Sequence, residues 1–427
     1  MSPVDKVRTR ALAWLILMIS VRAALDQVLQ DVHPLTTERV ALPQAAGRVL
    51  AASVRATRDV PTFRNSAMDG YALQARDVSA ASPEHPVPLR VLEVVAAGVV
   101  PRQAVAAGTA TKIMTGSVMP DGADAVVRVE DTEEHDGQVW VRSRVTPGAH
   151  VRHPGEDMRV GETVLTSGHV LRPADIGVLA SLSCAVVTVQ RRPQVAILAT
   201  GDELVDLGEP LGPGQIVNSN AYSLAAAVEE AGGVPRLLGI VRDSPETTRQ
   251  AFAAAFAADV VLSTGGVSMG MFDLVRQTLA ELGVVERFWK VAQKPGKPLT
   301  FGVRQQVPVF GLPGNPVSSL VCFYLYVRPA LRTMQGVSRV HLPTVNATLD
   351  EDVVTAAGLT EFVRCRVEGE SGAYHARATG SQSSGVLRSL SIGQGLIVAP
   401  PEVKTLTRGS TVRVIQLDDG ASASLPV

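Results

Sequence analysis

The sequence is poor in aromatic residues, in cysteine and in net charge. Aromatic residues make up 4% of the 427 residues and apolar residues 46%, so aliphatic side chains must fill most of the interior. The three cysteines, Cys184, Cys322 and Cys365, form no CxxC or Cys/His pattern, which argues against a disulfide framework and a structural zinc site. With 40 basic and 41 acidic residues, the chain has no overall field to attract nucleic acid or a membrane surface.

A long apolar run is also absent. The segment from Ala11 to Val21 follows three basic residues, as in a signal peptide, but it is shorter than the about 20 residues that span a bilayer. From Met18 to Asp31, apolar residues recur on one face of a helix instead. We therefore interpret residues 1–17 as an extension upstream of the first domain, and we predict a cytoplasmic protein without a membrane segment.

The order of predicted elements indicates several domains of the α/β class. Short β-runs broken by glycine and proline predict a small barrel or sandwich inserted into a helical and extended domain. After residue 191, strands alternate with helices, which predicts a three-layer domain with a mainly parallel sheet. The predicted division is an N-terminal extension (1–17), a discontinuous mixed domain (18–60 and 148–190), an inserted β-module (61–147), an α/β domain (191–338) and a C-terminal β-domain (339–427).

A glycine-rich loop follows one predicted strand of the α/β domain. In a doubly wound sheet, ligands bind beyond the carboxyl ends of the strands. Glycines allow the backbone to approach an anion closely, although a tight turn explains such a loop equally well. The loop matches neither a Walker A motif nor GxGxxG. The candidate ligand-binding residues in it are Ser263, Thr264, Gly265, Gly266 and Ser268.

Three acidic residues follow predicted strands or open the next helix. Asp273 heads the helix after the glycine-rich loop, where aspartate is a common N-cap. A carboxylate beside an anion-binding loop also suits a Mg²⁺ ion that bridges phosphate oxygens, and one carboxylate can fill both roles. Glu203 and Asp243 follow two other strands and would supply carboxylates to the same rim. Asp273 is thus a candidate Mg²⁺ ligand, with further carboxylates at the same rim.

Lys290, Lys294 and Lys297 lie in a loop that two prolines and a glycine make stiff. Lysine is a compact donor for phosphate or another oxyanion, so the rigid spacing favours an anion site over a solvated basic loop. The segment Pro313-Gly314-Asn315-Pro316 ends a further strand and starts an apolar helix expected over 317–334. Asn315 suits the helix cap and Pro316 the first turn, and the same geometry directs N–H donors at an anion.

Six motifs, taken together and in this order, resemble the MoeA/gephyrin E-domain family. They are Asn65–Ala72, Met114–Gly116, Thr200–Leu204, Ser263–Ser268, Lys294–Pro298 and Gly311–Pro316. The resemblance extends from Met18 to about Val414, and the eight-residue Asn65–Ala72 motif is highly specific. It implies an elongated four-domain subunit with a molybdopterin-binding type of α/β domain. It further implies a homodimer, with the active site between the α/β domain of one subunit and the β-module of the other.

The resemblance also implies an activity. Family members of the enzymatic type insert molybdate into adenylylated molybdopterin and release AMP and molybdenum cofactor. The reaction implies Mg²⁺ bound at Asp243 and Asp273, and a molybdopterin adenylyltransferase as upstream partner. The implied catalytic residues are Asp69, Asp157, Glu203, Asp243, Asp273, Lys290, Lys294 and Lys297. The implied substrate-binding residues are Thr115, Pro313, Pro316 and, by a looser match, Ser384, to which the loop geometry adds Gly314 and Asn315.

Three other functions stay open at this point. A molybdopterin adenylyltransferase needs only the α/β domain, so the β-module argues against it. A non-catalytic scaffold of the gephyrin E-domain type would not need the set of carboxylates. A nucleotide-pyrophosphate hydrolase is the weakest of the three. The sequence does not separate molybdenum from tungsten, and it does not assign an individual role to each acid.

Overall fold

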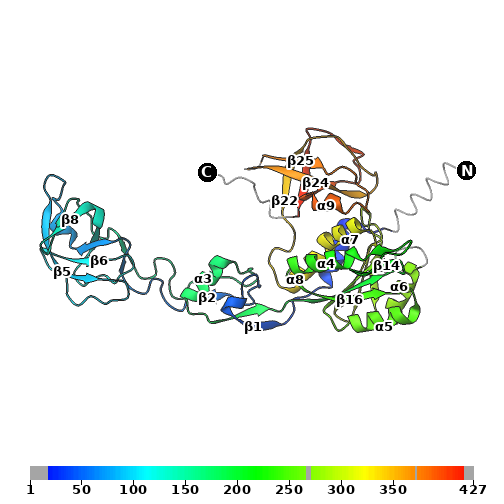
Figure 1. Ribbon diagram of the computed structural model, residues 1–427, viewed down its shortest axis with the longest axis horizontal. Helices are drawn as coiled ribbons and strands as arrows, with labels where there is room; N and C mark the ends of the chain where they lie inside the picture. The colour runs from blue at the N-terminus through cyan, green and yellow to red at the C-terminus, as the bar shows by residue number, and fades with distance from the viewer. Residues whose placement is uncertain (1–17, 266–270, 371–372, 418–427) are drawn as a thin grey trace, which may run out of the picture.

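The computed structural model describes residues 18–265, 271–370 and 373–417, with the side chains of 271–273 and 370 left out. The molecule is elongated (Figure 1): the β-module lies at one end, a small mixed module in the middle, and the α/β and C-terminal modules at the other end. The predicted α/β multidomain class is confirmed. Within the described residues, no helix is long and apolar enough to cross a membrane.

A six-stranded sheet forms the centre of the α/β domain, in the order β16-β13-β17-β21-β20-β18. The first four strands are parallel, and β20 and β18 complete the sheet in antiparallel pairings. The strands are β13 (Gln194–Thr200), β16 (Val234–Val241), β17 (Val260–Gly265), β18 (Val285–Trp289), β20 (Thr300–Arg304) and β21 (Val307–Leu312), with the short pair β14 (Leu204–Val205) and β15 (Ile216–Val217) beside them.

Helices cover both faces of this sheet, as the alternation of strands and helices predicts. They are α4 (Ser219–Glu230), α5 (Pro245–Ala255), α6 (Met271–Glu281), α7 (Pro316–Cys322) and α8 (Arg328–Met334). Leu224 of α4 belongs to the apolar cluster on one face, and Phe252 of α5 and Leu279 of α6 belong to the cluster on the other. The chain runs from β13 through α4 to β16 on one side of β13, and then through α5 to β17 on the other side. The strand order therefore reverses between β13 and β17, and α/β proteins bind ligands at such a reversal.

The helix predicted from Met18 is present as α2 (Val21–Gln30), but it packs elsewhere than expected. The sequence interpretation grouped it with the mixed domain. In the structure, Ala24 and Val28 are buried in the core of the α/β domain, because the apolar face of α2 covers the same side of the sheet as α4. A bridge between Ile19 and Val291 fixes its start. The other predicted domain boundaries stay predictions.

The apolar helix expected over 317–334 consists of three parts. A π-helical turn, Phe323–Val327, separates α7 from α8. Periodicity predicts the apolar run but not this local widening of the helix.

The middle module is built from two segments of the chain that lie side by side. Its elements are β1 (Thr37–Ala41), a 3₁₀ turn (Leu42–Gln44), β2 (Val54–Arg55), β11 (Thr163–Leu165), α3 (Pro173–Ser181) and β12 (Val186–Gln190). β1 pairs with β12 and β2 with β11, both antiparallel. The outgoing segment thus consists of two short strands with a turn between them.

The β-module contains one sheet in the order β7-β4-β6-β5-β9-β8. Its strands are β4 (Gly70–Leu73), β5 (Val87–Val95), β6 (Thr109–Ile113), β7 (Ala125–Arg128), β8 (Thr132–His135) and β9 (Gln138–Val141), with 3₁₀ turns at Ala75–Val78 and Val129–Asp131. β3 (Asn65–Ser66) and β10 (Val151–Arg152) pair where the chain enters and leaves the module. Successive residues of β4, Tyr71 and Ala72, point to opposite faces and enter different apolar clusters, so both faces of the sheet are covered.

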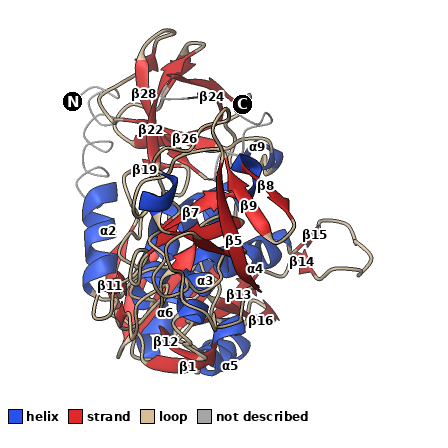
Figure 2. Ribbon diagram, turned by 90° about the vertical axis from the view of Figure 1, so that its left-hand side faces the viewer, coloured by secondary structure: helices blue, strands red, loops and turns tan. Residues whose placement is uncertain are grey.

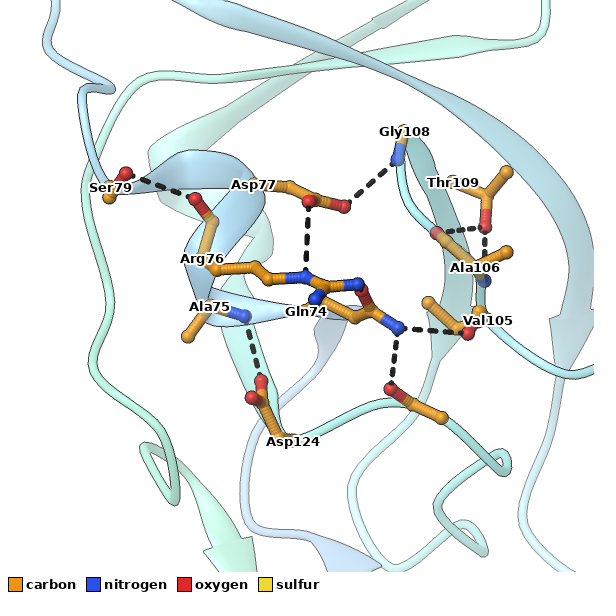
Figure 3. A network of polar contacts seen from close by, with 11 residues as sticks. Gln74, Ala75, Arg76, Asp77, Ser79, Val105, Ala106, Gly108, Thr109 and Asp124 are labelled. Atoms are coloured by element: carbon orange, nitrogen blue, oxygen red, sulfur yellow. Dashed lines mark hydrogen bonds and ion pairs between the residues drawn. The ribbon is translucent and has the colours of Figure 1, made fainter.

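A polar network holds the turn after β4 in place (Figure 3). Gln74 donates to the carbonyls of Val105 and Gly122, and Asp124 accepts from the backbone N–H of Ala75 at 2.7 Å. Asp77 accepts from the N–H of Gly108 at 2.9 Å. These bonds satisfy backbone groups of three loops at once and stabilise this end of the module.

The C-terminal domain is a sheet of five strands that closes on itself. Its elements are β22 (Thr344–Leu349), β23 (Val353–Val354), β24 (Thr360–Glu370), β25 (Ala373–Ala378), α9 (Arg388–Ser391), β26 (Gly395–Ala399), β27 (Thr405–Leu406) and β28 (Thr411–Gln416). The ring runs β24-β25-β22-β28-β26 and back to β24. β19 (Gln293–Lys294) of the α/β domain adds to β24 and joins the two domains.

An ion pair fixes the start of β13, where the middle module meets the α/β domain. The Asp259 carboxylate accepts two bonds from the Arg191 guanidinium, at 2.8 and 2.7 Å, and one from the backbone N–H of Gln194. Burial opposes ionisation, but Arg191 and the Gln194 N–H hold the pKa of Asp259 below its ordinary value. Only 19% of the Asp259 side chain is exposed.

Asp259→Asn should therefore lower the free energy of unfolding by about 1.5–3 kcal/mol near neutral pH. A carboxylate with a lowered pKa contributes stability above its ordinary pKa and loses it as the pH falls through the lowered value. The difference from wild type should shrink in acid accordingly, as urea-induced unfolding at a series of pH values will show. Asp26→Asn, which breaks the exposed Arg22–Asp26 pair on α2, is the matched control and should change stability little. Equal effects of the two variants would contradict the prediction.

Candidate active site

The carboxyl ends of β13, β16, β17 and β21 lie along one edge of the sheet, as the parallel pairings require. A cavity of about 270 Å³ lies there, and the short β14–β15 segment projects beside it (Figure 2). Its lining includes Thr200, Glu203, Asn220, Thr264, Gly265, Gly314, Pro316 and Gly385. The structure thus brings together four predicted loop positions and Glu203. Gly266 and Ser268 lie outside the described residues.

Asn220, in the first turn of α4, connects the two loops that the sequence predicts as anion sites. Its amide donates to the Thr264 hydroxyl and to the Gly314 carbonyl, both at 2.8 Å. The Thr264 hydroxyl in turn donates to the carbonyl of Pro313 at 3.2 Å. Ser263 and Thr264 are both buried. Sequence reasoning did not single out Asn220, because an asparagine at a helix start is accounted for by its propensity for that position.

Three acidic residues gather beyond β13 and β16. The backbone N–H of Asp243 donates to the Asp202 carboxylate at 3.1 Å, and Glu203 is the next residue. Burial, followed by the negative charge of Asp202, raises the pKa of Asp243 above its ordinary value. One Asp243 oxygen, Oδ1, is buried and has no hydrogen-bond partner among the described residues. A buried carboxylate oxygen in negative surroundings is a site at which a cation stabilises the charged form.

The Asp243 site therefore fits a divalent cation, but it does not hold one by itself. Within the described part of the chain, no three histidine, cysteine, aspartate or glutamate side chains converge as a metal site. Mg²⁺ is commonly bound by one or two carboxylates together with phosphate oxygens of a substrate, which agrees with this incomplete set. Asp273, the second predicted ligand and the predicted N-cap, is instead the third residue of α6, which begins at Met271, and its side chain lies outside the described residues.

A basic group lies on the other side of β17. The Lys290 ammonium is 3.6 Å from the centre of the Trp289 ring, and the Arg276 guanidinium is 4.5 Å from it. Burial, followed by the charges of Lys297 and Arg276, lowers the pKa of Lys290. Such mutual repulsion decreases when an anion binds, so the group of Arg276, Lys290 and Lys297 is suited to an anionic ligand.

Lys294 has a partner that the loop pattern did not predict. Its ammonium lies 2.9 Å from the carboxylate of Glu361, a β24 residue that is 4% exposed. Glu361 also accepts from the backbone N–H of Ala356. Lys294 therefore compensates a buried charge and connects the α/β domain to the C-terminal domain, although 47% of its own side chain is exposed. Lys297 is also exposed, and no ion pair to a carboxylate is found for it among the described residues.

Lys297→Ala should weaken the binding of molybdate or AMP about tenfold or more, with no change in melting temperature. Lys294→Ala should lower the melting temperature, because it leaves the Glu361 carboxylate buried without its cation. Calorimetric titration and thermal melts measure both effects, with the exposed Lys404→Ala as control. An unchanged anion affinity of Lys297→Ala, or equal melting temperatures of the two loop variants, would be inconsistent with these roles.

A loop of the C-terminal domain meets the start of α7. Asn315 takes the N-cap position and Pro316 the first turn, as predicted, but the Asn315 amide donates to the Ser384 hydroxyl at 2.9 Å instead of capping the helix. Arg364 holds this loop from inside: its buried guanidinium donates to the carbonyls of Ser381, Gln382 and Ser383. The loosely matched Ser384 thus lies at the predicted loop. Arg364 gave no signal in the sequence, since its role depends on the tertiary fold.

The remaining candidates lie in another part of the molecule. Asp69, just before β4, accepts from the N–H and hydroxyl of Thr115 at 2.7 and 2.8 Å, and these bonds lower the pKa of Asp69. Asp157 lies near the junction with the middle module, where its N–H donates to Val60. The β-module and the α/β domain are at opposite ends of the subunit (Figure 1), so a single chain does not bring Asp69 and Thr115 to the lysines.

Comparisons with known proteins cover nearly the whole described chain. Residues 19–183 match the MoeA N-terminal region (domain I and II), residues 196–333 a probable molybdopterin binding domain, and residues 346–417 the MoeA C-terminal region (domain IV). The molybdopterin molybdenumtransferase of Nostoc sp. is 40% identical over 89% of each chain. Molybdopterin molybdenumtransferase 2 of Mycobacterium tuberculosis is 37% identical over 92% of this chain and 97% of that protein.

Solved structures agree with this assignment. The molybdopterin biosynthesis moeA protein from Pyrococcus horikoshii OT3 superposes with a TM-score of 0.81 at 33% identity, over 93% of this chain and 100% of the other. Sequence and fold are therefore similar along the same length. The chain belongs to the MoeA family, the molybdopterin molybdenumtransferases of molybdenum cofactor biosynthesis.

Proposed function

We propose that this chain inserts molybdate into adenylylated molybdopterin and releases AMP and molybdenum cofactor. The observation that carries the proposal is that one edge of a molybdopterin-binding type of domain presents two groups. One is the Asp243 carboxylate, whose buried Oδ1 has no hydrogen-bond partner among the described residues, and the other is the basic group around Lys290. Both substrates are anions, and their reaction requires them to meet in one cleft. The membership of the family and the names of its curated relatives support the same reaction.

Each group in the site would have a separate role in this reaction. Lys290 and Lys297 bind anionic oxygens of the two substrates and reduce the repulsion between them. Asn220 keeps Thr264 and Gly314 at a fixed spacing at the cavity. Glu203, which lines the cavity, can give or take the proton that accompanies loss of a molybdate oxygen as water. Mg²⁺, held by Asp243 and Asp273 together with phosphate oxygens, would polarise the anhydride when bound.

The distribution of the candidates favours a homodimer. Asp69 and Thr115 of the β-module act in the same site as the lysines only if a second subunit places its β-module at the α/β domain. An isologous dimer forms two such sites by symmetry. We further propose that a molybdopterin adenylyltransferase supplies the adenylylated substrate, and that the protein acts in the cytoplasm.

AMP release from adenylylated molybdopterin by the purified chain tests the reaction. We expect release that requires both molybdate and Mg²⁺. Release without molybdate would instead identify a nucleotide-pyrophosphate hydrolase. Consumption of ATP with molybdopterin as acceptor would identify an adenylyltransferase, and no turnover of either kind would favour a scaffold.

A further inference from the structure

The lysine loop, residues 290–298, is closed by two backbone hydrogen bonds. The N–H of Lys290 donates to the carbonyl of Leu299, and the N–H of Val291 donates to that of Lys297, both at 3.0 Å. Lys290 itself has a φ of 72°, in the left-handed region that residues other than glycine seldom adopt. The loop therefore brings Lys290 and Lys297 together in a shape that its own backbone does not favour, and the surrounding structure stabilises it.

The Gln293 side chain fills the inside of the lysine loop. It is fully buried, and its amide nitrogen donates to the Pro295 carbonyl at 3.1 Å and to Cys322 Sγ at 3.5 Å. Its amide oxygen accepts from the Tyr326 hydroxyl. Both donors and the acceptor of this amide thus have partners, one in the loop and two in the helical segment that follows β21.

The same helical segment contacts the loop backbone directly. The thiol of Cys322, the last residue of α7, donates to the Gly296 carbonyl at 3.5 Å. Gly296 has a φ of 92°, and a Cβ there would overlap Cys322 Sγ and lie 2.7 Å from Gln293 Nε2. Tyr326 lies in the π-helical turn after α7, and such turns are frequent at functional sites. Gln293 therefore joins the loop to a helix against which the loop already packs.

Electrostatic repulsion opposes the spacing of the cations that this loop presents. Burial, followed by the charges of Lys297 and Arg276, lowers the pKa of Lys290, so the three cations are near enough to repel one another. A loop without internal support would relax by moving its ammonium groups apart. Contacts with the rest of the domain, such as those of Gln293, therefore maintain the spacing before an anion arrives.

We propose that Gln293, held by Tyr326 and Cys322, is a positioning residue that keeps Lys290 and Lys297 at the spacing at which they bind an anion. The inference rests on the proposed function, in which these two lysines bind oxygens of the substrates. Gln293 does not touch a substrate, because it is buried and acts through the loop backbone at Pro295. Cations that are already in place bind an anion without the cost of bringing like charges together during binding.

The test compares two buried glutamines of the α/β domain. Gln293→Met keeps an unbranched side chain of similar length and removes the amide. Gln335→Met does the same just after α8, where the buried Gln335 amide donates to the carbonyls of Ala231 and Leu331 at 2.8 and 2.9 Å. Both variants should lower the melting temperature. Only Gln293→Met should also weaken the binding of molybdate or AMP in calorimetric titrations, by about three- to tenfold.

Two further measurements separate positioning from packing. The chain has six lysines, so NMR with ¹³C-labelled lysine can follow the titration of Lys290, whose signal Lys290→Arg identifies. The pKa of Lys290 should rise toward its ordinary value in Gln293→Met but not in Gln335→Met, because a relaxed loop moves Lys297 away. In the double variant Gln293→Met/Lys297→Ala, anion affinity should fall by less than the product of the two single effects, since Gln293 acts partly through Lys297.

Wild-type anion affinity or an unchanged Lys290 pKa in Gln293→Met overturns the proposal, and so does an equal loss of affinity in Gln335→Met. Tyr326→Phe removes only the bond to the Gln293 oxygen and should weaken anion binding in the same direction. If Gln293→Met does not fold, wild-type anion affinity in Tyr326→Phe overturns the proposal instead. None of these measurements uses turnover, so absence of molybdate-dependent AMP release would reject the proposed function and leave the role of Gln293 standing.

Discussion

Replacing Asp243 with asparagine should reduce molybdate-dependent release of AMP by about two to four orders of magnitude, because a metal ion bound to a phosphate contributes several kcal/mol to catalysis. Asparagine has the shape of aspartate and no charge, so it would bind Mg²⁺ poorly. The initial rate of AMP release at saturating Mg²⁺ measures the effect. Asp121→Asn, on the exposed surface of the β-module, is the control and should leave the rate unchanged.

The same variant should be more stable than wild type near neutral pH. Burial and Asp202 raise the pKa of Asp243, so the ionised carboxylate costs stability above that raised value. Below the ordinary pKa, the residue is protonated in both folded and unfolded chains and the cost is absent. The advantage of Asp243→Asn should therefore disappear as the pH falls through this window. A wild-type rate of AMP release in the variant would show that this carboxylate is not needed.

A mixed dimer of one Asp69→Asn chain and one Lys297→Ala chain should recover about half of the wild-type activity, although both homodimers are nearly inactive. The reason is the distance between the two groups within one subunit: if the partner supplies the β-module, one of the two sites in the mixed dimer contains both intact residues. Chains with two different affinity tags allow the mixed dimer to be purified and assayed. Asparagine retains the oxygen that accepts from Thr115, so Asp69→Asn should fold normally.

The complementary control places both substitutions in one chain and pairs it with a wild-type chain. Each site then contains one altered residue, and this dimer should be nearly inactive. Activity in this dimer but not in the first one would show that Asp69 and Lys297 act within one subunit. Absence of a dimer would contradict the proposed assembly directly.

Local patterns predicted the parts of the site that depend on neighbours in the chain. Strand ends followed by Gly265, Gly314 or Asp243 could be placed on one edge, because parallel strands end on the same side. Residues that act across domains gave no such signal. Glu361 and Arg364 lie in an ordinary β-strand pattern. Their roles arise only because β24 pairs with β19 and lies where Arg364 can bond to the carbonyls of the loop before Ser384.

The position of α2 is a case in which the sequence predicted the element but not the core against which it packs. Its periodicity was sufficient to predict a helix with one apolar face, but the face does not specify which core it enters. The structure buries Ala24 and Val28 beside β13, although the next residues of the chain lead into the middle module.

The chain passes twice through the junction on either side of the middle module, once outward and once on its return (Figure 1). Near the α/β domain, the two crossing segments are tied together by the pairing of Thr37 with Gln190, and near the β-module by the bridge between Val60 and Met158. Two covalent segments therefore join the middle module to each of these neighbours. They also mean that a protease that nicks a single crossing segment leaves the modules covalently attached through the other, so the molecule keeps its architecture after one cut.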